Sequence, residues 1–142
     1  MSVEIRILRR GDERVLANIA PGVFNFAIDP QFSREFLEDS RHHLAVAIED
    51  DGMIVGFASA LHYVHPDKPP EMWIIEVGVA PPHQRRGVGK RLLSALLELG
   101  QSLGCGEAWV LTDTSNDAAR RLYASAGAEV PRDQVMFTFK LK

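Results

Sequence analysis

Residues 84–90 combine the side chains and glycines that bind phosphate groups. The segment reads Gln84-Arg85-Arg86-Gly87-Val88-Gly89-Lys90 and lies between an apolar run, 73–79, and a long amphipathic pattern, 88–103. A strand that turns through glycines into a helix leaves backbone N–H groups free, and the helix dipole adds partial positive charge there. The arginines add further charge, and the glycines let phosphate oxygens approach the main chain. The segment therefore predicts a site for the pyrophosphate of a phosphorylated cofactor.

Two widespread phosphate-binding patterns do not fit this segment. The Walker pattern requires glycine at position 84 and serine or threonine at position 91, where the chain has Gln84 and Arg91. The dinucleotide fingerprint requires a third glycine at position 92, where the chain has Leu92, and no βαβ unit precedes it. These positions argue against a P-loop protein and against a Rossmann-fold enzyme.

Hydrophobic periodicity and turn residues indicate the elements that would position the segment. We expect strands at 3–8, 44–48, 53–63, 71–79, 108–111 and 135–141, with 108–111 buried. We expect helices at 12–20, 31–38, 88–103 and 116–126. A polar turn at Asp50, Asp51 and Gly52 would join the second and third strands into a hairpin.

Two motifs resemble those of the GCN5-related N-acetyltransferase (GNAT) superfamily. Residues 84–89 match the glutamine/arginine-x-x-glycine-x-glycine/alanine signature of its acetyl-coenzyme A loop. Val77-Gly-Val79 looks like its splayed fourth strand, and the spacing of Asn116, Ala119, Tyr123 and Gly127 looks like its later helix. The element order is similar over nearly the whole chain. The resemblance implies an α/β (α+β) GNAT fold: one domain, 1–142, with a mixed, mostly antiparallel sheet of about six to seven strands, splayed strands 4 and 5, and about four helices.

The same resemblance implies where acetyl-coenzyme A (acetyl-CoA) would bind as cosubstrate. Its pantetheine arm would pass between the fourth and fifth strands, near Asn116, and its pyrophosphate would lie on residues 84–90. Tyr123 would lie near the sulfur and donate a proton to the thiolate, although it could instead be a core residue. The expected cofactor-binding residues are Val77, Val79, Gln84, Arg85, Arg86, Gly87, Val88, Gly89, Lys90, Asn116 and Ala119.

Acetyl transfer to an amine needs a base, because an alkyl ammonium with a pKa near ~10 is almost fully protonated at neutral pH. Glu76 is the expected base. It lies in the otherwise apolar run 72–79, where burial would make a carboxylate a better base than a solvated one. The alternative is a strand carboxylate paired with an arginine. Backbone N–H groups from Val77 to Val79 would polarise the thioester carbonyl.

A closer resemblance concerns the acceptor amine. Segments 71–79 and 109–123 look like those of small aminoglycoside 3-N-acetyltransferases. A polycationic aminoglycoside needs several carboxylates around its groove, which Glu71, Glu76, Asp113 and Asp117 would supply. Solvated surface carboxylates remain the alternative for the two aspartates. Acetylation of another small amine, a polyamine or a peptide, and a non-catalytic acyl-CoA sensor, are also left open.

Composition narrows the class of protein. A chain of 142 residues with 46% hydrophobic content can bury one core, and a net charge of −3 argues against a nucleic-acid partner. No window reaches the ~20 apolar residues of a membrane span, so we expect a cytoplasmic protein without a membrane partner.

The histidines at 42, 43, 62 and 65 lack further ligands that would complete a metal site, so we expect no metal. Exposed edge strands near the C-terminus would allow a homodimer.

Overall fold

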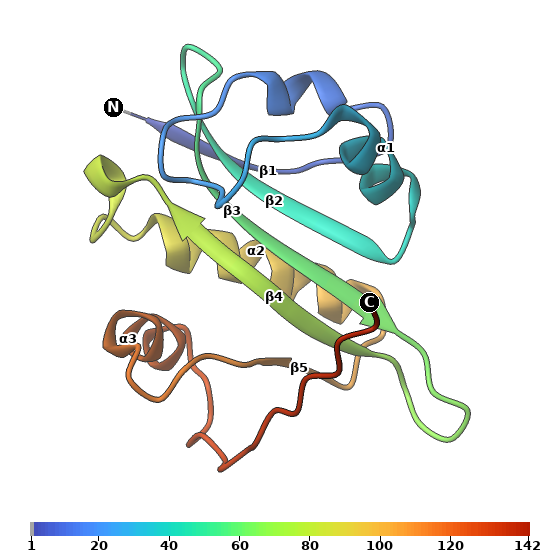
Figure 1. Ribbon diagram of the computed structural model, residues 1–142. Helices are drawn as coiled ribbons and strands as arrows, with labels where there is room; N and C mark the ends of the chain where they lie inside the picture. The colour runs from blue at the N-terminus through green and yellow to red at the C-terminus, as the bar shows by residue number, and fades with distance from the viewer. Residues whose placement is uncertain (1) are drawn as a thin grey trace.

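A computed structural model describes residues 2–142, and its centre is one twisted sheet with the strand order β1-β2-β3-β4-β5 (Figure 1). The first four strands pair antiparallel, and β5 pairs parallel to β4 after a helical crossover. The strands are β1 (Val3–Ile7), β2 (His42–Glu49), β3 (Ile54–Tyr63), β4 (Glu71–Val79) and β5 (Glu107–Val110). The helices are η1 (Glu13–Ala17), α1 (Pro30–Glu38), η2 (Pro81–His83), α2 (Val88–Ser102) and α3 (Asp117–Ser125), of which η1 and η2 are 3-10 helices.

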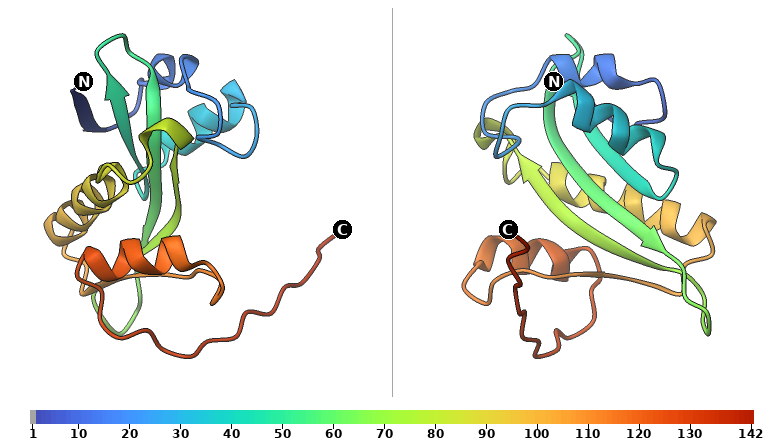
Figure 2. Two further views of the ribbon diagram at one scale, coloured as in Figure 1. Left: turned by 90° about the vertical axis from the view of Figure 1, so that its left-hand side faces the viewer. Right: turned by 45° about the vertical axis from the view of Figure 1, so that its right-hand side comes forward.

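The helices cover the sheet unequally. Figure 2 shows α2 on one face and η1 with α1 on the other. α3 lies beside β5 and packs against the start of α2, where Leu122 approaches Gly89. The two faces near β1 to β4 are therefore covered, whereas the β5 end of the sheet is thinly covered.

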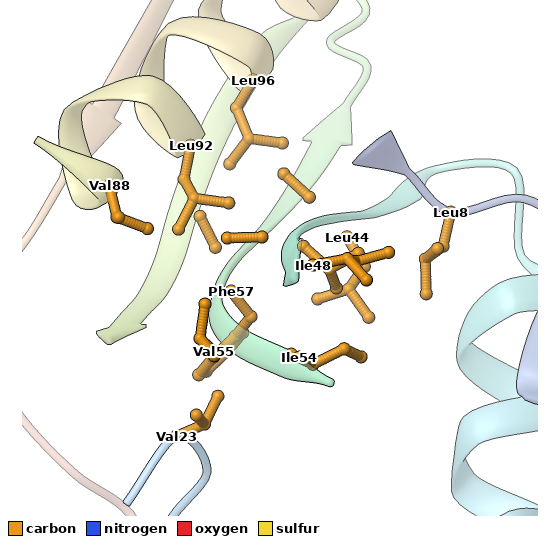
Figure 3. Packing of buried hydrophobic residues seen from close by; sticks show 14 of the residues in the cluster. Leu8, Val23, Leu44, Ile48, Ile54, Val55, Phe57, Val88, Leu92 and Leu96 are labelled. Carbon is orange, nitrogen blue, oxygen red and sulfur yellow. The ribbon is translucent and has the colours of Figure 1, made fainter. Parts of the chain in front are cut away.

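The main core lies between α2 and the sheet. Buried α2 side chains recur at three- and four-residue intervals, which places them on one face of the helix. Figure 3 shows Val88, Leu92 and Leu96 of α2 directed towards the sheet, where Gly56 of β3 leaves room for Val88 and Leu92. Phe57, on the other face of β3, stacks on Phe24. Such burial stabilises the fold by roughly 1.5–3 kcal/mol per large aliphatic side chain. This packing holds the N-terminal end of α2 firmly against the end of β4.

Local sequence accounts for the hairpin and for α1. The β2–β3 turn falls at Asp50 to Gly52, where the Asp51 carboxylate accepts a hydrogen bond from the Met53 N–H at 3.0 Å. The Asp29 carboxylate caps α1 by accepting from the N–H groups of Gln31 and Phe32, and proline follows at the first helical position. Both elements lie where the sequence predicts them.

The fold class is the predicted one, but the element count is smaller. Within residues 2–142 the sheet has five strands, and three α-helices accompany it. The segment expected as a strand at 135–141 is extended but pairs with no strand of the described chain. The helix expected at 12–20 is the short 3-10 helix η1. The expected burial of 108–111 is wrong, because β5 is an edge strand with exposed or partly buried residues.

Candidate active site

A local irregularity in β4 opens the sheet between β4 and β5. Ser59 of β3 pairs with Glu76, and the next residue, Ala60, pairs with Ile74, so Ile75 is an extra residue in β4. The parallel pairing of β4 with β5 ends just before this β-bulge, at Ile74 with Val110. Bulges bend a strand and terminate its pairing. The second half of β4 therefore separates from β5, as the family resemblance implies for strands 4 and 5.

The main chain of Val77 and Val79 faces this opening. The Ala80 N–H donates to the Val55 carbonyl at 2.8 Å, towards β3. Because backbone groups of an antiparallel strand alternate in direction, those of Val77 and Val79 point to the other edge. The Val79 carbonyl accepts a hydrogen bond from the Gln84 side-chain amide at 2.9 Å. The backbone N–H and C=O of Val77 are thus free to bind a ligand, whereas the Val79 carbonyl already accepts the hydrogen bond from Gln84.

The segment from Gln84 to Lys90 forms a loop rich in free N–H groups. Gly87 precedes α2 with φ +79°, and Arg85 has φ +61°, so both take left-handed conformations. Among residues 2–142, no hydrogen-bond acceptor is found for the backbone N–H groups of residues 85–90; the first helical bond runs from the Arg91 N–H to the Gly87 carbonyl. Successive unpaired N–H groups at a helix start bind anions well.

Charge around the loop has the sign that a phosphate requires. The Arg85, Arg86 and Lys90 side chains are exposed, and a hollow lined by Arg86, Lys90 and Arg91 adjoins the loop along α2. Val88, by contrast, is buried in the core, so its N–H is the only part of it that can serve a ligand. The residues present therefore fit the pyrophosphate of acetyl-CoA.

Contacts from distant parts of the chain fix the loop in place. Nε2 of His83, the last residue of η2, contacts the Glu49 Oε1 at the end of β2. A Cβ on Gly89 would lie 3.2 Å from the Leu122 Cδ2, so glycine there lets α3 approach α2. The sequence gives no local signal for the Glu49–His83 pair, because 34 positions separate the two residues.

Glu76 lies on β4 just past the bulge, but its environment differs from the expected one. Its side chain is exposed, so the prediction of a buried base is wrong. The bulge shifts the alternation of β4 and turns Glu76 to the face of Ser59, away from α2. Among residues 2–142, no ion pair to an arginine involves Glu76, so its carboxylate faces solvent.

Tyr123 lies on α3 and is half-buried. Burial raises the pKa of its hydroxyl above the usual value, which keeps the phenol protonated. Asn116 is the N-cap of α3, and its side-chain oxygen accepts the Ala119 N–H at 3.0 Å. Asn116 therefore has a structural role in starting α3, and its amide nitrogen remains available to a ligand.

An aromatic cluster that the sequence did not reveal lies beside Glu71. Trp73 of β4 and Trp109 of β5 stack with their ring centroids 5.4 Å apart, and the Trp109 Nε1–H donates to the Tyr63 hydroxyl at 2.7 Å. That hydroxyl donates to the Glu71 carboxylate at 3.1 Å. The Lys68 ammonium, 3.2 Å away, is the main cause that lowers the Glu71 pKa. The pairing of aromatic residues across β3, β4 and β5 is visible only once the strands are in register.

The two aspartates expected at the acceptor groove lie on the β5 and α3 side. Asp113 is exposed in the loop after β5, and its carbonyl accepts the Asn116 N–H. Asp117 is exposed in the first turn of α3, where a carboxylate complements the helix dipole. No hydrogen bond or ion pair found within residues 2–142 joins these aspartates to the residues around Glu71 or Glu76.

In the described part of the chain, no group of three or more histidine, cysteine, aspartate or glutamate side chains has the arrangement of a metal site. None of the helices in that part combines the length and apolar character needed to cross a membrane.

Comparisons with known proteins agree with this geometry. The model of the acetyltransferase (GNAT) family matches residues 14–128. The N-alpha-acetyltransferase RimI of Mycobacterium tuberculosis is 33% identical over 129 residues, which cover 88% of this chain and 77% of that protein. Aminoglycoside N(6′)-acetyltransferase type 1 of Salmonella typhimurium is 33% identical over 92 residues, which cover 61% of this chain and 63% of the relative.

A solved structure shares the architecture as well. The aminoglycoside N-acetyltransferase AAC(6′)-Iy in complex with CoA superposes with a TM-score of 0.76 at 25% identity, covering 99% of this chain and 95% of that one. The β-bulge, the split between β4 and β5 and the loop at 84–90 thus occur in a chain whose overall fold matches a CoA-binding protein.

Proposed function

The chain belongs to the acetyltransferase (GNAT) family and is an N-acetyltransferase, and from this premise we propose that it acetylates a primary amine of an aminoglycoside with acetyl-CoA as donor. The main support for acetyl-CoA as donor is the loop 84–90, because its free N–H groups and exposed cationic side chains suit a pyrophosphate. Bound acetyl-CoA would supply an acetyl thioester.

The chain's own residues then account for cofactor binding. The N–H groups of residues 85–90 would hold the pyrophosphate, with Arg85, Arg86 and Lys90 adding charge. The open main chain of Val77 would hold the pantetheine amides as a neighbouring strand does, and its N–H would polarise the thioester carbonyl. Gln84 serves indirectly, because its hydrogen bond to Val79 shapes the loop.

Two side chains handle the protons of the reaction. Glu76 is exposed beside the opening, so it would accept the proton of the acceptor ammonium directly or through one water molecule. Tyr123 has a raised pKa, caused by burial, and would give its proton to the departing thiolate sulfur. Glu76 lies on β4, which forms one side of the split, and Tyr123 lies on α3, which follows β5 along the chain.

The acceptor would lie along the β4 face that carries Glu71 and Glu76. They lie five positions apart along the strand, which corresponds to roughly 16 Å at ~3.3 Å per residue and suits a ligand with several rings and amines. The stacked Trp73 and Trp109 offer a flat aromatic surface between these carboxylates and α3. Ammonium groups bind well to such a combination of carboxylates and ring faces. Asp113 and Asp117 would add negative charge from the far side.

A second acceptor class is favoured by one specific observation. The relative RimI is an N-alpha-acetyltransferase and matches 88% of this chain, more than the aminoglycoside N(6′)-acetyltransferase does. A peptide N-terminus would use the same donor site, Glu76 and Tyr123, but would need no second carboxylate for a distant amine. Glu71 is already paired with Lys68, but the exposed carboxylates of Glu76, Asp113 and Asp117 favour the polycationic acceptor.

The acetylated position is a separate question. From the sequence we expect acetylation of the 3-amine. The names of the two aminoglycoside acetyltransferases that resemble this chain give the 6′ position instead. Their names favour the 6′-amine, and we adopt it for the proposal.

A thiol-release assay with acetyl-CoA tests the proposal. Aminoglycosides with and without a 6′-amine, polyamines and N-terminal peptides are compared as acceptors, with no-amine reactions as controls. We expect the largest kcat/KM for 6′-amino aminoglycosides, with the product acetylated there by NMR. A higher kcat/KM for peptides would identify a peptide N-terminus as the acceptor and contradict the aminoglycoside proposal. Thiol release with 3-amino compounds that lack the 6′-amine would show that the 3-amine is acetylated.

A further inference from the structure

The loop 84–90 has few contacts of its own to hold its shape. Within residues 2–142, the backbone N–H groups of residues 85–90 find no acceptor, and they are the groups proposed for the pyrophosphate. Arg85 also takes a left-handed conformation, with φ +61°. That conformation is disfavoured for a residue with a side chain and persists only where the surrounding structure holds it. Contacts outside the loop must therefore keep it in one conformation.

The residue before the loop is tied to the end of β2. Nε2 of His83 contacts the Glu49 Oε1, and the two side chains are only 12% and 17% exposed. Within residues 2–142 no partner is found for the buried Nδ1 of His83, so the carboxylate is the one polar contact of this imidazole. Glu49 is itself held firmly, because its N–H donates to the Met53 carbonyl and its carbonyl accepts from the Gly52 N–H, both at 2.9 Å.

The residue after the loop is tied to β1. Nη2 of Arg91 donates a hydrogen bond to the Val3 carbonyl at 2.8 Å, although 88 positions separate the two residues. The backbone N–H of Arg91 donates to the Gly87 carbonyl at 3.1 Å, which is the first helical bond of α2. The side-chain contact therefore holds the point at which the loop becomes a helix.

Both contacts reach the same place in the sheet. Val3 and Glu49 are direct cross-strand partners in the antiparallel pair β1–β2. One cross-strand pair thus binds His83, immediately before the loop, and Arg91, immediately after it. The two ends of the loop are fixed to one point of a hydrogen-bonded sheet, so they cannot move apart without breaking one of these contacts.

We infer that Val3, Glu49, His83 and Arg91 form a clamp that positions the loop 84–90 for the donor before the donor binds. Glu49 and His83 are positioning residues that act through the loop. Preorganisation of this kind raises affinity, because less conformational freedom is lost on binding. The inference rests on the donor site proposed above and adds to it residues that lie outside the loop.

Order of the loop in the unliganded protein is the first test. Backbone amide order parameters of residues 84–90 are measured by NMR relaxation in the native chain and in E49L, H83L and R91M. We expect native values near the ~0.85 of a rigid backbone and a fall towards ~0.6 in each variant. E49Q keeps an oxygen that can accept from His83, so it should keep the native values. Low values in the native chain, or unchanged values in E49L, H83L and R91M, would overturn the inference.

Donor affinity is the second test, with circular dichroism to show that each variant is folded. E49L and H83L should each raise the calorimetric Kd for coenzyme A and the KM for acetyl-CoA about tenfold, with kcat within about twofold of the native value. E49Q should stay near the native constants. The matched control H42L breaks another histidine–carboxylate pair, His42 with Asp39 at 3.3 Å, and should change neither constant. A fall in kcat with an unchanged KM would contradict a positioning role.

A double variant and a loop variant separate the possible failures. E49L and H83L break the same contact, so E49L/H83L should weaken coenzyme A binding no more than either single change, and additive effects would overturn the inference. K90Q removes a charge proposed for the pyrophosphate and should weaken binding with or without the clamp. Binding weakened by K90Q but unchanged in E49L and H83L would overturn the clamp and leave the donor site standing. A native chain that does not bind coenzyme A would overturn both.

Discussion

Replacing Tyr123 with phenylalanine should slow acetyl transfer without weakening the fold. The substitution removes only the hydroxyl, for which no hydrogen-bond partner is found within residues 2–142, so the free energy of unfolding should change by less than about 0.5 kcal/mol. A positioned general acid contributes about 10²–10⁴-fold to a rate. We expect the lower end, about 100-fold in kcat or ~2.7 kcal/mol, because a thiol with a pKa near ~8.5 is already a moderate leaving group.

Stopped-flow or steady-state thiol release on Y123F measures this loss, with the KM for acetyl-CoA expected to stay within about twofold. The other tyrosine of the chain supplies the control. Y63F loses the hydroxyl that joins Trp109 to Glu71, so it should raise the acceptor KM more than it lowers kcat. Because burial raises the Tyr123 pKa, the native enzyme should retain its proton donor at alkaline pH beyond the usual tyrosine value. A kcat for Y123F within threefold of the native value would refute the proton-donor role.

Three further predictions concern the base, the split strand and acid stability. Glu76→Gln should lower kcat about 100-fold at neutral pH with unchanged CoA affinity by calorimetry; unchanged turnover would remove it as the base. Gly78→Ala should lower the free energy of unfolding by about 1–3 kcal/mol in thermal unfolding, because the added Cβ would lie 2.4 Å from the Val23 carbonyl oxygen. The control Gly106→Ala, whose added Cβ would make an ordinary 3.7 Å contact, should leave stability unchanged. Equal effects of the two substitutions would contradict the close packing at Gly78. Burial lowers the His43 pKa from 6.5 to about 4, so the unfolded chain binds a proton that the folded chain does not. Stability should therefore fall by about 2 kcal/mol between pH 6.5 and pH 4 in denaturant titrations, and His43→Gln should reduce that fall; an equal fall in the variant would exclude His43 as its source.

Strong local patterns made much of the fold predictable. The α2 helix carries a regular apolar stripe and begins after glycine, and the β2–β3 hairpin has a polar tip at Asp51 and Gly52. The loop 84–90, between β4 and α2, combines glycines with cationic side chains. The residues that form each of these patterns lie close together in the sequence, so the patterns can be recognised without knowledge of the tertiary structure.

Features that depend on register or on distant contacts were not predictable. The exposure of Glu76 follows from the bulge at Ile75, which shifts the alternation of β4 by one residue. The Glu49–His83 pair and the stacking of Trp73 on Trp109 join elements far apart in the sequence. The strand expected at 135–141 is wrong for residues 2–142: its apolar residues alternate as in a strand, but the segment pairs with no strand of the described chain.

The binding site of the donor is the central claim, and a crystal structure of the complex with coenzyme A tests it most directly. We predict that the pyrophosphate oxygens accept hydrogen bonds from N–H groups of residues 85–90. The pantetheine arm should lie in the split between β4 and β5 against the main chain of Val77, with its sulfur near Tyr123. Coenzyme A bound elsewhere, or with its pyrophosphate away from this loop, would contradict the account.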